Sequence, residues 1–342
     1  MTPLIAVDAM GGDQGLEAVV PGVAEASLST GAHILVVGDE EQIARALDQV
    51  EHDPGRIEIR HAPDAISMDA SPRKALETFP DASLPSAARL VAAEGGPDAL
   101  VSAGNTGAVV LACAQAFQLL PRIRRSALAA VIPTELPHGP KGDPFALLLD
   151  AGATVRVEAK DLLAFGLMGS AYARLISSNE SPRVALLSNG SEANKGTPEV
   201  VQAHRLLESA EDVQFMGNIE GVDITHGRAD VIVTDGFVGN ITLKMLEGVS
   251  ETVMELARYA HRSRVSWRVA MWLLKNGLDR LKEVTDWQQY GGAPVLGFDR
   301  LCIKAHGRSN PRAIRNAIRV AERCVRNQLT TEIAESLQKT VS

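Results

Sequence analysis

Residues 183–208 read RVALLSNGSEANKGTPEVVQAHRLLE, a short apolar strand followed by a glycine-rich loop and a helix. The strand covers 183–187, and Thr197 is a suitable N-cap for a helix that runs to Glu208. Pro198 fits the first turn of that helix, because its missing N–H would have no intrahelical acceptor there. The stretch therefore predicts one strand–loop–helix unit.

The same alternation recurs along the chain. Apolar and β-branched runs predict further strands at 4–8, 33–38, 57–60, 98–104, 128–134, 145–152 and 229–236. Segments of helical length lie between many of them, at 16–29, 106–120 and 159–177. This spacing favours right-handed crossovers between parallel strands. We predict an α/β fold with a mainly parallel sheet and helices on both faces, built as a single large domain over residues 1–342.

The bulk composition narrows the class of protein. Of 342 residues, 45% are hydrophobic and 4% aromatic, and the formal net charge is −8. A chain with this charge is a poor partner for nucleic acid over its whole surface. Cys113, Cys302 and Cys324 show no metal or redox spacing, so we expect small buried side chains there. With no signal-peptide pattern and no long apolar run, we expect a cytoplasmic protein.

Glycine-rich turns with Asn or Asp follow several of the predicted strands. They are DAMGGD (8–13), SAGNTGA (102–108), DAGAT (150–154), SNGSEANKG (188–196) and TDGFVGN (234–240). In open parallel sheets, ligands bind outside the carboxyl ends of the strands. The recurrence of these turns predicts a binding site at that edge, although no G-x-G-x-x-G sequence indicates a dinucleotide.

The loop in the opening stretch is a candidate anion site. Lys195 and Gly196 lie just before a helix N-terminus, where free amides and the helix dipole favour negative charge. A nucleotide-binding loop has the order G-x-x-x-x-G-K-[ST], whereas here Lys195 precedes Gly196, so nucleotide wrapping is not indicated. A structural pair between Lys195 and Glu192 is the alternative interpretation.

Other candidate residues stand at other strand ends. They are Gly104, Asn105, Thr106 and Gly107 in the second turn, Asp235 and Asn240 in the last, and Lys304 and His306 in KAHGRSN (304–310). We find no G-x-S-x-G sequence, no Cys–His pair and no metal-ligand spacing, and we expect neither a metal nor a cofactor. Amides, lysines and an imidazole suit direct attack by an oxyanion, aided by positioning and electrostatics.

Residues 248–290 break the alternation and predict a helical hairpin with a short break near 261–266. Between Arg258 and Lys275 the segment carries five basic residues and no acidic ones. Basic residues with tryptophan at helical spacing suit a membrane-surface helix, and packing on a partner subunit is the alternative. The predicted membrane contacts are Arg262, Arg264, Trp267, Arg268 and Trp272.

Taken together, these motifs resemble the bacterial phosphate acyltransferases of glycerolipid synthesis, the PlsX family. The matching stretches cover almost the whole chain and include IAVDAMGGD (5–13), VSAGNTGA (101–108), GSEANKGTPEV (190–200), ADVIVTDGFVGNITLKMLEG (229–248), YGGAPVLG (290–297) and KAHGRS (304–309). The resemblance implies a fold like that of phosphate acetyltransferases and isocitrate- or isopropylmalate-type dehydrogenases, with the helical hairpin as an excursion.

The resemblance also implies an activity and partners. The activity is transfer of a fatty acyl group from acyl carrier protein to inorganic phosphate, which forms acyl phosphate for glycerophospholipid synthesis. The implied partners are a second copy of the chain in a homodimer, the membrane surface with which members associate peripherally, and a membrane glycerol-3-phosphate acyltransferase. Alternatives are a phosphate acetyltransferase-like enzyme that uses acyl-CoA, and a weakly active paralogue that acts as a membrane-surface scaffold.

The matched positions carry expected roles. Lys195 and His306 are expected to bind phosphate or the thioester oxygen, and Asp235 and Asn240 to orient phosphate or the pantetheine arm. The expected anion pocket comprises Gly104, Asn105, Thr106, Gly107, Gly196, Thr197 and Lys304, while Asp8 and Glu192 are expected to hold the lysines. The sequence departs from the family pattern at 77–82 (ETFPDA) and at Thr154. Cations expected near 77–80 are missing.

Overall fold

The computed structural model describes residues 2–138, 143–263 and 291–339, and its strands form two sheets rather than one. The larger sheet has the order β3-β2-β1-β4-β12-β11-β5 and comprises β1 (Leu4–Asp8), β2 (His33–Gly38), β3 (Ile57–His61), β4 (Ala99–Ser102), β5 (Ala127–Leu128), β11 (Ala293–Leu296) and β12 (Leu301–Lys304). The smaller sheet has the order β6-β7-β10-β8-β9 and comprises β6 (Ala130–His138), β7 (Asp143–Leu149), β8 (Arg183–Leu187), β9 (Gln214–Ile219) and β10 (Val231–Val233).

Most neighbouring strands are parallel, as predicted. In the larger sheet β3, β2, β1, β4 and β12 run the same way, and β11 is antiparallel to both β12 and β5. In the smaller sheet β7, β10, β8 and β9 are parallel, and β6 is an antiparallel edge strand. The carboxyl ends of the parallel strands in each sheet therefore share one edge, where the glycine-rich turns lie.

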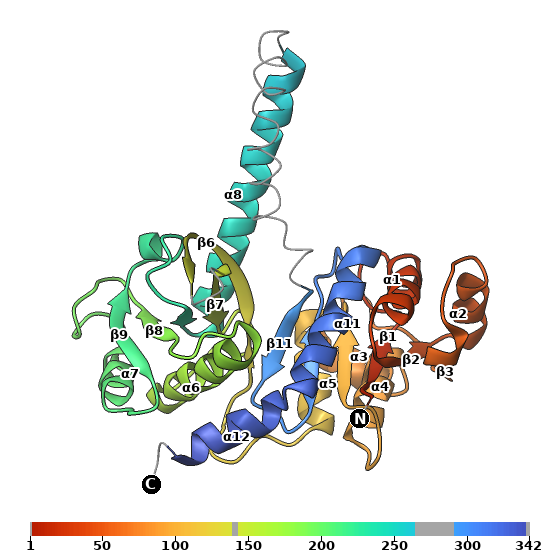
Figure 1. Cartoon of the computed structure of the whole chain (residues 1–342), viewed down its shortest axis with the longest axis horizontal. Coiled ribbons are helices and arrows are strands. Elements are labelled where there is room, and N and C mark those ends of the chain that lie inside the picture. The colour runs from red at the N-terminus through yellow and green to blue at the C-terminus, as the bar shows by residue number, and fades with distance from the viewer. Residues whose placement is uncertain (1, 139–142, 264–290, 340–342) are drawn as a thin grey trace.

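Helices cover both faces of the sheets (Figure 1). Those packed with the larger sheet are α1 (Leu16–Ser29), α2 (Glu40–Leu47), α3 (Pro72–Thr78), α4 (Ser83–Ala92), α5 (Thr106–Ala116) and α11 (Pro311–Arg326). Those on the side of the smaller sheet are α6 (Ala159–Ile176), α7 (Pro198–Glu208), α8 (Gly236–Ser263) and α12 (Leu329–Lys339). The mixed α/β architecture is confirmed.

The core consists of two apolar layers, and each layer runs through both sheets. In β1, Ile5 and Val7 belong to one layer and Ala6 to the other. A strand buried on both faces needs a continuous apolar run, which explains the sequence LIAVD. The first layer reaches the smaller sheet at Leu149 and the second at Leu148. All three cysteines are buried, as expected.

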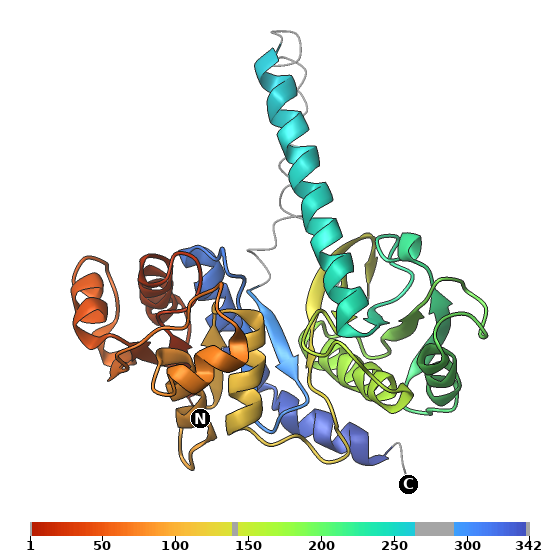
Figure 2. The same ribbon diagram turned by 180° about the vertical axis from the view of Figure 1, so that it is seen from behind.

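Helix α8 departs from the predicted boundaries. The sequence pattern extends the last glycine-rich turn to Asn240, but the helix begins at Gly236 and continues to Ser263. Asp235 caps it, since its carboxylate accepts hydrogen bonds from the amides of Phe237 and Val238, both at 2.9 Å. The helix projects away from the body of the molecule (Figures 1 and 2). Residues 264–290 of the expected hairpin lie outside the described residues, so the domain boundaries stay a prediction.

Candidate active site

A cavity of about 560 Å³, here called the front cleft, lies between the two sheets. From the side of the larger sheet it is lined by Asp13, Met68, Asn105, Thr106, Gly107, Lys304, Ala305, His306, Gly307, Arg308 and Ser309, and from the other side mainly by Val131, Ala151, Gly152, Asn240, Leu243, Lys244 and Glu247. The first group lies at or after the carboxyl ends of β1, β4 and β12, with Met68 in the loop after β3. In the second group, Val131 lies on β6, and the other residues follow β7 or lie on the first turns of α8.

Lys304, the last residue of β12, is the buried cation of the front cleft, with 6% of its surface exposed. Its Nζ donates to the carbonyl oxygens of Ala103, at 3.4 Å, and of Ala305. Burial disfavours the charged form and lowers the pKa of Lys304 to about 8. An ammonium group has three donors. Among the described residues Lys304 has two acceptors, so one donor remains for a ligand.

Asp8 lies behind Lys304 and contributes to its environment. Its carboxylate accepts hydrogen bonds from the hydroxyls of Ser83, at 2.6 Å, and Ser102, at 2.7 Å. Burial raises the pKa of Asp8 despite these hydrogen bonds. Asp8 does not line the front cleft, but its charge acts on Lys304 and favours the protonated lysine. The expected role of Asp8 as a residue that holds a lysine stays a prediction.

His306 faces α8 across the front cleft. Its Nδ1 accepts a hydrogen bond from the Arg308 amide at 3.1 Å, which places the proton of the neutral ring on Nε2. Nε2 lies 3.6 Å from Glu247 Oε1, and Lys244 Nζ lies 2.7 Å from Glu247 Oε2. Burial alone would raise the pKa of Glu247, but hydrogen bonds from His306 and Lys244 outweigh it and lower the pKa to about 2. Glu247 is therefore ionised and orients two donors.

The N-terminus of α5 forms another wall of the front cleft. Asn105 is its N-cap, accepting from the Ala108 amide at 3.1 Å, while its own amide group donates to the Met68 carbonyl at 2.7 Å. The amides of Thr106 and Gly107 belong to the first turn of the helix, where no intrahelical acceptor exists. Helix N-termini of this kind bind anions.

Ser309, at the other end of the KAHGRSN turn, offers a further donor. Its hydroxyl is buried and has no hydrogen-bond partner within the described residues. The residue lines the front cleft directly before α11. A buried hydroxyl without a partner is costly, so a ligand in the cleft would relieve it.

The structure does not bring the loop of the opening stretch into the front cleft. Glu192, Lys195, Gly196 and Thr197 are exposed and are not among the residues that line it. The Asn218 side chain donates to the Glu192 carbonyl at 2.9 Å, which holds the loop against β9. Strand β8, which precedes the loop, is separated from β7 by β10. The predicted capping of α7 by Thr197 is confirmed, with the Val200 amide at 3.4 Å.

Of the remaining predicted residues, some line the front cleft and others lie elsewhere in the fold. Asn240 lines the front cleft beside Gly152, whose φ of +132° suits only glycine and permits close approach to the Asn240 side chain. Gly104 is buried against Gly11, and Asp235 is engaged as the cap of α8. Arg262 is exposed near the end of α8. Arg264, Trp267, Arg268 and Trp272 lie outside the described residues.

The sequence pattern did not reveal Asp13, Met68, Lys244, Glu247, Arg308 and Ser309, all of which line the front cleft. A signal existed for the two residues on α8, because Asn240, Lys244 and Glu247 have the spacing of one helical face. That signal required the helix to be started at Gly236. Within the described residues, no cluster of three or more His, Cys, Asp or Glu side chains could hold a metal ion.

Comparisons with known proteins agree with this architecture. The model of a family described as "Fatty acid synthesis protein" matches residues 4–332. A phosphate acyltransferase from Nitratidesulfovibrio vulgaris is 37% identical over 334 residues, covering 98% of this chain and 94% of the relative. A phosphate acyltransferase from Moorella thermoacetica is 41% identical over 331 residues, covering 97% and 95%.

A solved structure shows the same fold at much lower sequence identity. The EutD phosphotransacetylase from Staphylococcus aureus superposes with a TM-score of 0.59 at 16% identity, covering 95% of this chain and 94% of that one. At that identity the similarity concerns the fold alone. The matched family model and the full-length relatives show more: this chain belongs to the PlsX-type family of fatty acid synthesis proteins, whose curated members are called phosphate acyltransferases.

Proposed function

We propose that this chain transfers a fatty acyl group from acyl carrier protein to inorganic phosphate and so forms an acyl phosphate. Family membership supports acyl transfer to phosphate. The observation that carries the proposal is the front cleft itself, where Lys304, His306 and the N-terminus of α5 converge. That arrangement is a site for a small anion, and no nucleophilic side chain with an adjacent base accompanies it among the lining residues.

In the proposed reaction, phosphate is the nucleophile. It binds to the free donor of Lys304 and to the amides of Thr106 and Gly107, and one of its oxygens attacks the carbonyl carbon of the thioester. Attack forms the C–O bond and a tetrahedral intermediate, and collapse of this intermediate breaks the C–S bond. The released thiolate takes up the proton that the attacking hydrogen phosphate loses. In the free protein the Nε2–H of His306 faces Glu247 Oε1 at 3.6 Å, and on substrate binding it leaves that carboxylate to donate to the oxyanion of the tetrahedral intermediate, a contact that strengthens as charge develops. Glu247 is the positioning residue for His306.

Lys195 is the alternative candidate for the lysine that binds phosphate. The family pattern predicts that Lys195 binds phosphate, and the front cleft offers Lys304 for that task in the same chain. Replacement of each lysine in turn distinguishes the two assignments.

The proposal is tested by trapping the product. Full-length protein is incubated with palmitoyl-acyl carrier protein and phosphate, and hydroxylamine converts acyl phosphate into a hydroxamate that is measured by mass spectrometry. We expect hydroxamate only when protein, donor and phosphate are all present. Product from palmitoyl-CoA alone would favour the acetyltransferase-like alternative. No product from either donor would overturn acyl transfer and favour the scaffold alternative.

We also propose that α8 contacts a second copy of the chain and that residues 248–290 reach the membrane surface, where a membrane glycerol-3-phosphate acyltransferase would consume the product. Supporting this, α8 carries an exposed apolar row comprising Ile241, Met245, Val249, Val253 and Leu256. None of the helices in the described part of the chain combines the length and apolarity needed to span a bilayer. Sedimentation of Val253→Glu tests the dimer, and flotation of Trp267→Ala with anionic vesicles tests membrane contact. Unchanged behaviour of both variants would refute these roles.

A further inference from the structure

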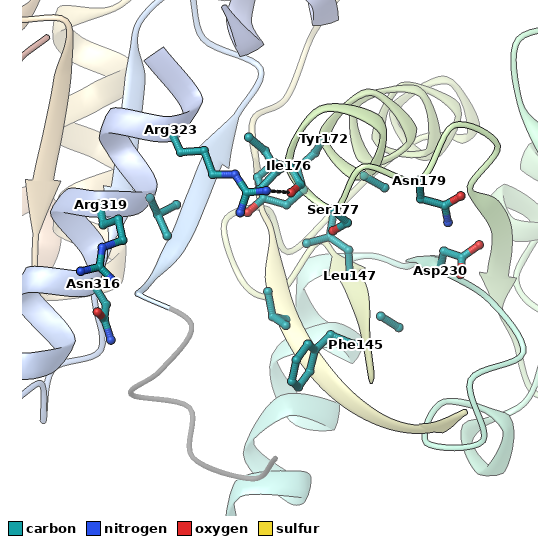
Figure 3. Close-up of a pocket in the computed structure, with 14 residues that line it drawn as sticks. Phe145, Leu147, Tyr172, Ile176, Ser177, Asn179, Asp230, Asn316, Arg319 and Arg323 are labelled. Atoms are coloured by element: carbon teal, nitrogen blue, oxygen red, sulfur yellow. Dashed lines mark hydrogen bonds between the residues drawn. The ribbon is translucent and has the colours of Figure 1, made fainter. Parts of the chain in front are cut away.

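A second cavity, here called the back cavity, lies between the same two sheets and has a volume of about 270 Å³ (Figure 3). Its lining includes Ser177 and Asn179, which precede β8, and Asp230, which precedes β10. The back cavity therefore opens toward the amino ends of these strands, opposite the edge that forms the front cleft. Val131 on β6 lines both cavities.

The two walls of the back cavity belong to different parts of the fold. Helix α11 supplies one wall and packs with α1 and β12 of the larger sheet. The other wall comes from β6, β7 and α6 of the smaller-sheet side. Its apolar floor consists of Val131, Phe145, Leu147, Tyr172 and Ile176, with Val320 facing them from α11. The floor can accommodate a hydrocarbon chain.

Two arginines on α11 make the back cavity cationic. Arg323 donates to the Ile176 carbonyl at the end of α6 and so links the two walls (Figure 3). Arg319 is exposed and has no hydrogen bond or ion pair within the described residues. The acidic residue in the lining, Asp230, is already paired with Arg183 at 3.1 Å. An uncompensated positive charge therefore stands beside an apolar floor.

We propose that the back cavity binds an amphipathic anion, with its hydrocarbon chain on the apolar floor and its carboxylate or phosphate head at Arg319, whose side chain lies apart from that of Arg323 (Figure 3). Arginine matches both head groups because its planar donors pair with two oxygens at once. At about 30 Å³ for each group of the size of a water molecule, 270 Å³ accommodates roughly nine chain atoms. The ligand class is therefore a medium-chain hydrocarbon with a carboxylate or phosphate head.

Binding in the back cavity should affect how the two sheets are arranged relative to each other. A ligand that touches α11 and the α6–β7 wall together favours the arrangement of the two sheets in which both contacts are made. Because Val131 lies in the wall of each cavity, we expect the same arrangement to change the width of the front cleft. The proposed site does not rest on acyl transfer, and it is tested by direct binding without turnover.

The test is isothermal titration calorimetry of the full-length protein with decanoate below its micellar concentration. We expect saturable binding of one decanoate per chain. Arg319→Ala should weaken it at least about tenfold, because a charged hydrogen bond is lost, and Arg319→Glu should abolish it. Arg326→Ala is the matched control on the same helix, since Arg326 pairs with Glu322 at 2.8 Å and does not line the back cavity.

Further arms test the space in the back cavity and the charge of its ligand. Ala173→Leu fills the cavity without changing charge and should also abolish binding, and decanol should bind at least about tenfold more weakly than decanoate. Decyl phosphate in place of decanoate shows which head group is preferred. The proposal would be overturned if Arg326→Ala and Arg319→Ala weakened binding equally, or if Arg319→Glu bound decanoate like the wild type. It would also be overturned if only Lys304→Met lost binding, because decanoate would then occupy the front cleft.

Discussion

Two lysines of this chain have similar sequence surroundings and very different environments. Lys304 ends a strand and Lys195 follows one, and each precedes a glycine and a helix that begins with proline. Lys304 is buried in the front cleft and its pKa falls to about 8, whereas Lys195 is exposed on a loop held against β9. The difference arises from strand order. Strand β12 lies between β4 and β11 in the larger sheet and its last residue lines the front cleft, whereas β8 is separated from β7 by β10.

Replacing each lysine with methionine gives the largest expected contrast. We expect Lys304→Met to reduce hydroxamate formation about 100-fold, because the attacking phosphate loses its charged anchor and is misplaced. Lys195→Met should retain most activity because no residue of the front cleft loses a partner. Thermal unfolding of both variants controls for damage to the fold. A large loss in Lys195→Met with full activity in Lys304→Met would reverse the assignment and move the phosphate site to the loop at 188–197.

A change of pH should affect phosphate binding through the buried Lys304. Below its pKa of about 8, Lys304 is charged and binds phosphate. The KM for phosphate should therefore rise above about pH 8, by roughly tenfold for each further pH unit once the lysine is mostly neutral. Arginine stays protonated, so this limb should disappear in Lys304→Arg. Initial rates in phosphate series, corrected for phosphate ionisation, measure both. An unchanged limb in Lys304→Arg would assign it to another group.

The lowered pKa of Lys304 also predicts how the free energy of unfolding changes with pH. Its pKa is about 8 in the folded state against an ordinary value of 10.5, so between these values the unfolded chain binds more protons. The stability contributed by this residue therefore increases as pH rises from about 8 to 10.5. Urea unfolding at about pH 8 and about pH 10 should show this increment in the wild type and not in Lys304→Met.

The smallest expected effect comes from replacing the N-cap residues of two helices. Asn105 caps α5 inside the front cleft, and Thr197 caps α7 at the remote loop. Replacing either with alanine should cost about 1 kcal/mol, seen as a lower melting temperature by roughly 2 °C. Only Asn105→Ala should also raise KM for phosphate, since it loosens the amides that face the ligand. Equal kinetics in the two variants would show that the α5 terminus does not bind phosphate.

Much of the fold follows from local sequence. The strand at 4–8 and the helix at 16–29 lie where the sequence predicts them, because an apolar run bounded by Gly and Asp leaves few alternatives. The division into two sheets was not predictable in the same way. Strand order depends on pairings between residues far apart in the chain, such as β4 with β12, and no local pattern encodes them.

The candidate site shows the same division. Asn105, Thr106 and His306 are identifiable from sequence because they punctuate strands, and the structure brings them together in the front cleft. Lys244 and Glu247 escape prediction because the glycine pattern extends the turn at 234–240 past Asp235. Asp235 has the residue type of an N-cap, and a helix started there places Lys244 four residues after Asn240 on one face.

Helix α8 joins two surfaces that the sequence pattern treats separately. Its first turns carry Lys244 and Glu247 into the front cleft, and the same uninterrupted helix carries Leu256 and Tyr259, exposed by 62% and 70%, away from the body. From Glu247 to Ser263 it extends about 24 Å. One continuous helix therefore connects the front cleft to an exposed surface. A contact that restrains the exposed end of α8 should also restrain the position of the Glu247 carboxylate relative to His306.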